Sequence, residues 1–511
     1  MQKHNEQLAR QAFLVFLPPA TCHLNGPVLL VFLSLVTGHL NAARRLPTLK
    51  NSLQRPGILV CVTLFLALFA WYHAPSFSFY FSQDDFPLLV SSRPGWVSPW
   101  VFFVTGSPRE YRPLTQHFFF YFNQLLFGQN PTPHHAMVLL VHLANALLVA
   151  WLASRWLTLW AAFPAAVLFA FHPIHFYEVF WISGISQSGY VFFLLCTLLL
   201  FSKFLANGHR GFLVASLATA VAAFLSKEDA VMVPAILVLV AVLEPGRRGR
   251  LLARTAATIP FWILLALYIG VRFGLLGFGV PHEGVYRFGG DLRQICEKLD
   301  LYRVWLTLGW KFYLPALALV GTALFEAGRS GRFALRAVTT MLFFFLSLAL
   351  LSVAPTLLIP GSAEHYLSVP SAALGLTIAA LLLSLRSHWV RAVATAMLLL
   401  MFGWSALQGR REHLDNPSLF VPIPAKAELC ERWMGQLGQQ QPPADSACTF
   451  VFRDLPLESW ERGWFEALVR MAWNRPSGEV IVHTSGMPEP AAPTPCAAVW
   501  SFLSGDAVRI Q

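Results

Sequence analysis

Two adjacent carboxylates, Asp84 and Asp85, follow the first long apolar stretch of the sequence, in the segment FSQDDFPLL at 81–89. Such a pair is either a solvated turn before Pro87 or a site that accepts a proton from a bound hydroxyl group. General-base chemistry needs one carboxylate within hydrogen-bond reach of the reacting proton. The other polar residues of the chain decide between these interpretations.

Further acids, cations and histidines cluster in four later segments that interrupt or border apolar stretches. These segments are PREYRPLTQH (108–117), HPIHFYEVFWISG (172–184), SKED (226–229) and SAEHY (362–366). A charged side chain near a bilayer is costly, so it marks a site or a pathway unless it is solvated. By contrast, His142 lies within an apolar stretch and is more typical of a packed, hydrogen-bonded histidine than of a ligand.

The chain that must position these residues has the composition of a membrane protein. Of its 511 residues, 56% are hydrophobic and 12% are charged, whereas soluble domains carry about 25% charged residues. A helix needs roughly 20 apolar residues to cross about 30 Å of hydrocarbon. We therefore predict an all-α polytopic membrane protein with about eleven transmembrane helices. The predicted spans cover residues 56–74, 134–154, 157–172, 187–206, 211–226, 229–244, 256–276, 302–324, 337–358, 367–385 and 391–408.

The basic residues between these spans predict the orientation, because Lys and Arg in short connections stay on the cytoplasmic side. With the N-terminus cytoplasmic, every basic cluster between spans falls inside, including GRRGRLLAR (246–254) and GRSGRFALR (328–336). The segments with the candidate residues then all face outside. This pattern is typical of a site at the outer interface, whereas a pore would place polar residues along successive turns within the spans.

The net charge of +11 follows from the same bias. No basic patch is interleaved with aromatic residues in the manner of an RNA-binding protein, so we predict no nucleic-acid partner. The compact chain, without an organelle-type address, favours a bacterial inner membrane with the C-terminal domain in the periplasm.

Changes of composition divide the chain into three parts. Residues 1–55 form an N-terminal cytoplasmic or interfacial extension, whose apolar stretch at 13–40 is broken by prolines and is not counted as a span. Residues 56–408 form the membrane domain, with a first outer loop at 75–133. The composition of residues 409–511 predicts a small extracytoplasmic α/β domain.

Within that last part, apolar alternation predicts strands at 448–456 and 478–486, a helix at 458–473 and a hairpin at 497–510. Four cysteines on the outer face allow one disulfide, and their spacing does not indicate zinc. They are Cys296, Cys430, Cys448 and Cys496.

The order of these motifs resembles the C-superfamily (GT-C) of integral-membrane glycosyltransferases. The motifs are DD in the first outer loop, YRPLT, HLANA, HPxxxE followed by WISG, SKED, and AEHYLSVPS. The match covers roughly residues 56–385 and is nearest to the protein O-mannosyltransferase and transmembrane-TPR (TMTC) branch with its bacterial relatives. Two features depart from that branch: no TPR repeats follow, and His365 stands where TMTC-like members often carry Arg.

The resemblance implies transfer of a sugar from a polyprenyl-phosphate donor to a protein, lipid or glycan acceptor at the outer face, with inversion. An Asp in the first outer loop would be the general base, and cations would stabilise the phosphate leaving group. Glu178 would orient sugar hydroxyls or partner the aspartates, braced by His172. The candidates are Asp84, Asp85 and Glu178 for catalysis, Arg112, Lys227 and His365 for phosphate binding, and His172, Glu228 and Glu364 for support.

Two other functions fit a chain of this kind. A lipid-linked sugar flippase or other polytopic transporter also has many spans and outer acids, but it predicts charged groups in mid-span. In a scaffold with a periplasmic binding domain, the charged residues on the outer face would have no shared function. The sequence identifies no definite cofactor, and the need for a metal stays open, because Asp84, Asp85 and Glu178 together have the oxygen ligands that a divalent cation prefers.

Overall fold

The computed structural model describes residues 56–104, 110–243, 251–277, 289–415, 423–440, 449–455, 462–474, 480–484, 497–501 and 508–509. Residues 1–74 and 75–511 form two compact units, which are described separately. The predicted extension at 1–55 lies outside the described residues. The described part of the first unit is α4 (Pro56–His73), an apolar helix along which the rings of Phe65, Phe69 and His73 contact one another.

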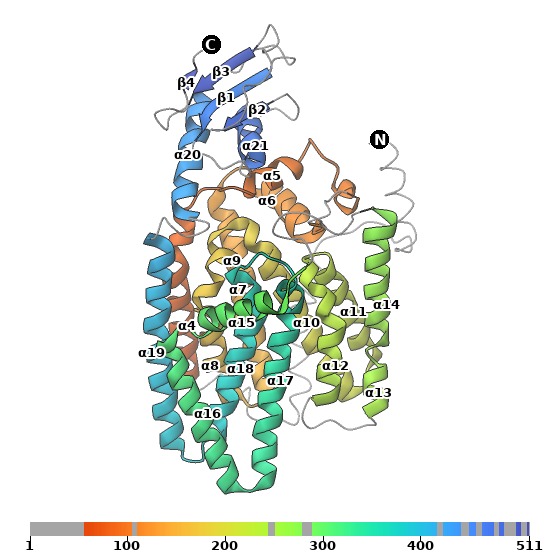
Figure 1. The fold of residues 1–511 in the computed structure, drawn as a ribbon, viewed down its shortest axis with the longest axis vertical. Helices are drawn as coiled ribbons and strands as arrows, with labels where there is room; N and C mark the ends of the chain where they lie inside the picture. The colour runs from red at the N-terminus through yellow and green to blue at the C-terminus, as the bar shows by residue number, and fades with distance from the viewer. Residues whose placement is uncertain are drawn as a thin grey trace. The chain divides into compact units, whose positions relative to one another are not determined.

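Long helices dominate the second unit, and short turns connect them (Figure 1). The α-helices are α5 (Asp85–Ser91), α6 (Phe119–Phe127), α7 (Pro131–Trp156), α8 (Leu159–Ala170), α9 (Phe176–Phe180), α10 (Ile185–Asn207), α11 (Arg210–Phe224), α12 (Val233–Leu243), α13 (Leu251–Ala256), α14 (Ile259–Ile269), α15 (Leu292–Leu306), α16 (Trp310–Ser330), α17 (Arg332–Leu357), α18 (Ser368–Ser384), α19 (His388–Asp415), α20 (Ile423–Gln439) and α21 (Arg462–Ala472). The 3₁₀ or π turns are η2 (Ala74–Ser78), η3 (Pro99–Phe103), η4 (Pro113–Phe118), η5 (Pro173–His175), η6 (Ile182–Gly184), η7 (Glu228–Met232), η8 (Gly270–Leu275) and η10 (Glu364–Leu367). Most of the candidate residues lie in or next to these turns.

Seven helices of the described chain are long and apolar enough to cross a membrane, or eight if one bent pair counts as a span. They are Val60–Ser78, Pro131–Trp156, Ile182–Asn207, Leu251–Leu275, Ala334–Leu357, Glu364–Ser384 and His388–Asp415. The protein is therefore a polytopic membrane protein, with fewer full-length spans than the eleven predicted. The apolar segments at 211–226 and 229–244 form the shorter helices α11 and α12. The segment at 302–324 is divided between α15 and α16, because Leu308 and Gly309 have positive φ angles of 51° and 68°.

The bent pair comprises Trp160–Ala170 and Pro173–Phe180, which meet at 54°. The bend has a local cause: Pro173 has no backbone N–H with which to continue α8. His172 caps the following turn, its ring accepting a hydrogen bond from the Ile174 N–H. The HPIHFYE segment therefore leaves the direction of the span and turns into the body of the protein.

Large apolar side chains on the outer helices are exposed. Examples in the second unit are Trp262, Leu317, Leu346 and Leu400 on α14, α16, α17 and α19. A soluble protein rarely exposes such continuous apolar surface. These faces are suited to contact lipid.

The inner helices pack through small residues and interlocking apolar side chains. Leu168, Phe312, Leu381 and Phe402 come from α8, α16, α18 and α19 and share one core. A Cβ atom at Gly375 of α18 would lie 3.1 Å from the Ala165 carbonyl oxygen, so glycine allows α18 to approach α8 closely. This core supports the turns at 172–184 and 364–367.

Past residue 440, the described segments form a four-stranded sheet with strand order β2-β1-β3-β4. The strands are β1 (Thr449–Leu455), β2 (Val480–Thr484), β3 (Ala497–Ser501) and β4 (Val508–Arg509). β1 is parallel to both β2 and β3, whereas β3 and β4 are antiparallel. Together with α20 and α21, these strands lie within the segments for which the sequence predicts an α/β domain.

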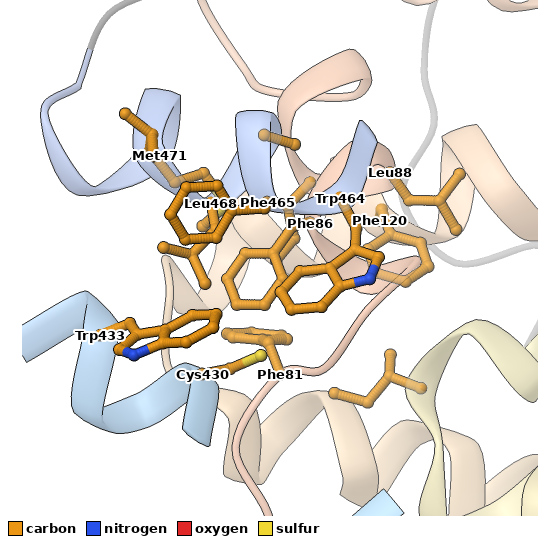
Figure 2. Packing of buried hydrophobic residues seen from close by; sticks show 14 of the residues in the cluster. Phe81, Phe86, Leu88, Phe120, Cys430, Trp433, Trp464, Phe465, Leu468 and Met471 are labelled. Carbon is orange, nitrogen blue, oxygen red and sulfur yellow. The ribbon is translucent and has the colours of Figure 1, made fainter. Parts of the chain in front are cut away.

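An aromatic cluster joins these C-terminal helices to α5 and the residues just before it (Figure 2). The rings of Phe86 on α5 and Trp464 on α21 are stacked with centroids 6.5 Å apart, and Trp433 on α20 stacks on Trp464 at 6.3 Å. Phe81, Phe86 and Trp433 are completely buried. The helix that begins at Asp85 therefore has the C-terminal helices as its apolar support.

Two of the four cysteines considered for a disulfide lie within the described residues. Cys430 is buried in the aromatic cluster, and Cys296 is exposed on α15, where it forms no disulfide with another described residue. Cys448 and Cys496 lie outside the described residues.

Candidate active site

The motifs identified in the sequence lie together and are joined by side-chain hydrogen bonds. Four such bonds connect Asp85 to Ser183, Thr115 to the Ser226 carbonyl, Lys227 to Gln187, and Glu178 to Ser368. Each bond joins two motifs, so segments spread from residue 82 to residue 371 form one polar region. Motifs that lie far apart in the sequence are thus in contact in the structure.

Asp85 is a completely hydrogen-bonded carboxylate. Its Oδ2 accepts from the Ser82 N–H at 2.9 Å, and its Oδ1 accepts from the Ser183 N–H at 2.8 Å and from the Ser183 hydroxyl. Burial raises the pKa of Asp85, while these donors favour the charged form and lower it. The side chain is 1% exposed. Asp85 thus holds the start of α5 against the WISG segment.

Asp84 has the opposite surroundings. Its side chain is exposed, and within the described residues its carboxylate has no hydrogen-bond partner. Protein nevertheless surrounds it closely, so desolvation raises its pKa to about 7, with repulsion from Glu110 adding to the shift and Arg112 opposing it. The preceding Gln83 has a φ of 47°, an uncommon angle for a residue other than glycine. A strained backbone residue thus stands directly before the one accessible carboxylate of the pair.

Two arginines and a backbone N–H converge on Glu228. Its Oε2 lies 2.8 Å from Arg112 Nε, and its Oε1 lies 3.3 Å from Arg272 Nη1 and accepts from the Tyr111 N–H at 2.8 Å. Burial raises the pKa of Glu228, but the two guanidinium groups outweigh burial and keep the pKa below its usual value. Arg112 also lies 3.7 Å from Glu110, which is near Asp84. Glu228 therefore holds two arginines beside the accessible aspartate.

Lys227 lies next to this cluster and is buried. Its Nζ donates to Gln187 Oε1, lies 3.4 Å from Asp229 Oδ2 and sits 4.7 Å from the centre of the Tyr366 ring. Burial lowers the pKa of Lys227, and Asp229 counteracts this effect. The contact with Tyr366 brings Lys227 to the residue that follows His365.

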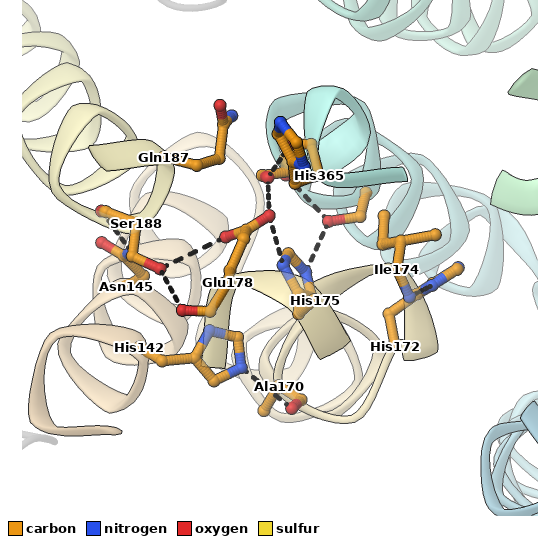
Figure 3. A network of polar contacts seen from close by, with 12 residues as sticks. His142, Asn145, Ala170, His172, Ile174, His175, Glu178, Gln187, Ser188 and His365 are labelled. Carbon is orange, nitrogen blue, oxygen red and sulfur yellow. Dashed lines mark hydrogen bonds and ion pairs between the residues drawn. The ribbon is translucent and has the colours of Figure 1, made fainter. Parts of the chain in front are cut away.

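Glu178 is the centre of a buried polar network (Figure 3). Its Oε1 lies 3.2 Å from His175 Nδ1 and accepts from the Ser368 hydroxyl, and its Oε2 accepts from the Ser188 hydroxyl at 3.3 Å. His175 Nε2 in turn lies 3.0 Å from Ser371 Oγ. Glu178 has no exposed surface, so in this arrangement it joins α9, α10 and α18 and cannot touch a substrate.

The sequence assigned the bracing of Glu178 to His172, and the structure corrects this assignment. The His172 ring contacts the Ile174 N–H and, through Nε2 at 2.9 Å, the Leu306 carbonyl. The histidine on Glu178 is His175. The reason is geometric: His172 caps the turn, whereas His175 lies three residues before Glu178 on the same helical face.

The SAEHY segment divides between two environments. Glu364 lies 2.7 Å from His413 Nε2 on α19 and thereby fixes the end of that helix. His365 is partly buried, its ring lies 4.7 Å from the ring of Tyr366, and its carbonyl accepts from Ser368 at 2.6 Å. Figure 3 shows His365 above Glu178. His365 is thus close to the site, whereas Glu364 supports the surrounding helices.

Two glycines of the WISGISQSGY segment lie where a side chain would collide with a neighbouring segment. A Cβ atom on Gly184 would lie 2.2 Å from the Tyr177 carbonyl oxygen and 2.8 Å from Glu178 Cα. A Cβ atom on Gly189 would lie 2.6 Å from Thr115 Cγ2 of the YRPLT motif. Both positions therefore allow the close approach that brings the motifs together.

Sequence reasoning missed several residues of this region. Arg272 had a detectable signal, because an arginine within the apolar stretch 251–275 is costly unless it has a partner. The other missed residues are Gln187, Ser183, Ser188, Ser368 and His413. Neutral polar residues of this kind are common in any sequence, so only the fold reveals their contacts.

The described residues contain no group of three or more His, Cys, Asp and Glu side chains placed to hold a metal ion. The set of Asp84, Asp85 and Glu178 considered from the sequence does not assemble. Asp85 is occupied by Ser82 and Ser183, and Glu178 is buried among other side chains.

No protein family and no curated protein matches the sequence. Solved structures match the fold. ArnT from Cupriavidus metallidurans bound to undecaprenyl phosphate superposes with a TM-score of 0.54 at 14% identity, covering 87% of this chain and 94% of that one. The apo state of the same protein gives 0.51 at 14% identity, covering 85% and 87%. The Archaeoglobus fulgidus oligosaccharyltransferase complex with Zn and sulfate gives 0.41 at 12% identity, covering 79% and 59%, which is too low to argue from. The chain therefore shares the fold of ArnT.

Proposed function

We propose that the protein is a glycosyltransferase that moves a sugar from a polyprenyl-phosphate donor to an acceptor at the outer face of the membrane. The observation that carries this proposal is the exposed carboxylate of Asp84 beside Arg112, which belongs to a cluster of cations. A base next to a group of phosphate-binding cations is what the reaction requires. The fold adds support, because ArnT with the same fold was solved with undecaprenyl phosphate bound.

Asp84, and not Asp85, is the general base in this proposal. Asp85 has both carboxylate oxygens engaged by Ser82 and Ser183, whereas Asp84 is accessible. Asp84 accepts the proton of the acceptor hydroxyl as the oxygen attacks the anomeric carbon. A new carbon–oxygen bond forms on one face of the sugar while the bond to phosphate breaks on the other. The configuration inverts, and polyprenyl phosphate leaves.

Arg112, Lys227 and Arg272 stabilise the departing phosphate in this scheme. Arginine suits a phosphate because its planar fork donates two parallel hydrogen bonds. Glu228 holds Arg112 and Arg272 in place. His365 lies beside Lys227 through Tyr366 and contributes a hydrogen bond to the same group.

Glu178 is a positioning residue in this proposal, together with His175. It fixes the relation between HPIHFYE, the start of α10 and the start of α18. Glu364 and His172 perform the same task farther from the chemistry, through His413 and Leu306.

The acceptor in this scheme is a hydroxyl of a protein, a lipid or a glycan. The membrane is a bacterial inner membrane, with the site and the C-terminal domain on the periplasmic side.

The test is a transfer assay with membranes that contain the full chain. Radiolabelled polyprenyl-phosphate sugars serve as donors, and label is followed into proteins, lipids and glycans and into free sugar. Asp84→Asn should lower transfer by about 10²–10⁴-fold, the usual contribution of a positioned base. Asp300→Asn, on the exposed face of α15, is the matched control and should transfer normally. Equal transfer by the native chain and Asp84→Asn refutes the proposal.

The same membranes test the flippase alternative. A fluorescent polyprenyl-phosphate sugar is inserted in one leaflet of liposomes, and its quenching is followed with and without the protein. Movement of the intact donor across the bilayer, with no label reaching any acceptor, supports a transporter and contradicts the transferase.

A further inference from the structure

A second group of cations lies at the far ends of α7 and α10, away from the candidate active site. On α10, the polar contacts of the site involve Gln187 and Ser188 near the helix start, whereas Lys203 lies fifteen residues farther along. At 1.5 Å per residue this is about 22 Å, most of the thickness of a bilayer core. Arg155, in the last turn of α7, is the second member of this group.

The two cations and two aromatic rings form a defined site. Arg155 Nη2 donates to the Ser202 carbonyl at 3.1 Å, and this bond ties α7 to α10. Lys203 Nζ lies 4.5 Å from the centre of the Trp151 ring and 5.5 Å from that of Phe212. Lys203 is 8% exposed. The lysine is therefore held between two ring faces directly beside the residue that Arg155 binds.

Among the described residues, no carboxylate forms an ion pair with either cation. The sequence has no Asp or Glu at 113–177 or at 179–227, so α7, α8, α10 and α11 carry none. Arg155 Nε is buried and has no hydrogen-bond partner among the described residues. Neither Arg155 nor Lys203 forms an ion pair within the described chain. A buried cation without a counter-ion is unfavourable, so this pair of cations is suited to bind an anionic group.

The helix ends account for only part of this arrangement. Cations are favourable at a helix C-terminus, and the bond from Arg155 to the Ser202 carbonyl uses that effect. Lys203, however, meets ring faces, which attract a cation but carry no net negative charge. Two neighbouring positive charges and an unused guanidinium donor together match a phosphate group, which offers several acceptor oxygens.

We propose that Arg155 and Lys203 bind the phosphate headgroup of an anionic phospholipid between α7 and α10. The apolar sides of these helices accommodate acyl chains, and Trp151 is of the residue type found at the level of lipid headgroups. Basic pockets between membrane helices bind anionic headgroups by this chemistry. The site is independent of the glycosyltransferase proposal, because none of its residues contacts the candidate catalytic groups.

The test is native mass spectrometry of the full chain in detergent, titrated with phosphatidylglycerol or phosphatidylcholine of identical acyl chains. The native protein should bind phosphatidylglycerol at least tenfold more tightly. Arg155→Gln and Lys203→Gln should each weaken this binding about fivefold, the effect of one cation near an anionic headgroup. Lys203→Arg should retain it. Arg336→Gln, which removes an exposed cation of α17, is the matched control and should bind like the native chain.

Three results would overturn the proposal. The first is equal binding of the two lipids by the native chain, which needs no variant and so does not depend on variant folding. The second is unchanged binding by the double variant. The third is displacement of phosphatidylglycerol by millimolar inorganic phosphate or by undecaprenyl phosphate at equal concentration, because the ligand would then be free phosphate or the isoprenoid carrier.

Discussion

The carboxylate of Asp85 accepts a hydrogen bond from the backbone N–H of Ser183 at 2.8 Å, across 98 positions of the sequence. Ser183 belongs to the WISG segment that follows Glu178 closely, so this bond fixes the start of α5 to the buried polar network. The neighbouring Asp84 is left with an accessible carboxylate. One member of the aspartate pair holds the loop, and the other is available for chemistry.

Asp85→Asn is expected to destabilise the protein. The amide keeps one acceptor oxygen but places an NH₂ group against either the Ser82 N–H or the Ser183 donors, which leaves buried groups unpaired at about 1–3 kcal/mol. The thermal unfolding midpoint in detergent should fall, whereas Asp84→Asn should leave it unchanged or higher. A normal midpoint for Asp85→Asn would show that its hydrogen bonds contribute little.

Transfer is expected to depend on pH through Asp84. Burial raises the pKa of Asp84 to about 7, and only the deprotonated form accepts a proton. The value of kcat/KM should therefore rise with pH and level off above about 7, whereas an ordinary aspartate would level off below about 5. A rate that is constant between these values would contradict the assignment of Asp84 as base.

Stability should show the complementary pH dependence. In the folded protein the raised pKa of Asp84 favours its protonated form. The folded protein therefore loses stability as the pH rises from the ordinary pKa of an aspartate toward about 7. Asp84→Asn mimics the protonated form. Its unfolding midpoint should match the native one near pH 4 and exceed it near pH 8, and a lower midpoint at pH 8 would contradict the cause given for the shift.

Glu228→Gln should release the two arginines. The variant keeps an oxygen for the Tyr111 N–H but leaves Arg112 and Arg272 without their shared carboxylate, at a cost of about 3 kcal/mol for a largely buried pair. The unfolding midpoint should fall and the KM for donor should rise. Glu297→Gln, which breaks an exposed pair with Arg293, is the control and should change stability by less than about 1 kcal/mol.

Gly184→Ala should separate HPIHFYE from WISG. The new methyl group would lie 2.2 Å from the Tyr177 carbonyl oxygen, and the backbone must move to admit it. We expect a loss of about 1–3 kcal/mol in stability, the usual cost of overpacking, and a large loss of transfer. Gly270→Ala, whose Cβ meets open space, should fold and transfer normally; equal behaviour of the two variants would refute the close approach.

Trp464→Ala should loosen α5 and thereby misplace Asp84. Removing a buried tryptophan costs about 3–5 kcal/mol, and here the ring stacks on both Phe86 and Trp433. Transfer at saturating donor should fall more than donor binding does. Trp389→Ala on the exposed surface of α19 is the control. Undiminished transfer by a folded Trp464→Ala would show that α5 keeps its position without this support.

The sequence singled out these motifs because several of them border apolar segments, where a charged residue is costly unless it has a partner. Arg112, Lys227 and Glu228 were identified in this way. The structure pairs Arg112 with Glu228 and Lys227 with Gln187, and Arg112 acts electrostatically on Asp84 as Lys227 does on Glu178. The composition likewise predicted a polytopic membrane protein, because hydropathy averages over many residues and tolerates local error.

Details of geometry could not be predicted in the same way. HPIHFYE contains two histidines, and the choice of His175 over His172 depends on where the turn begins. The break between α15 and α16 was not predicted, because positive φ angles at Leu308 and Gly309 interrupt an apolar stretch without any charged residue to mark the break. The different surroundings of Asp84 and Asp85 depend on the hydrogen bonds of Asp85 with Ser82 and Ser183. Serines are common in any sequence, so these two could not be recognised in advance.

The stacking of Trp464 on Phe86 has a consequence for sequence evolution and for the design of chimeric proteins. The helix that follows Asp84 and the helices that back it come from opposite ends of the second unit, so neither can be exchanged alone between relatives without exposing unmatched ring surfaces. Chimeras that change acceptor preference should transplant residues 79–127 and the stretch beyond 423 as a pair, and substitutions at the two ends of the chain should accumulate in step.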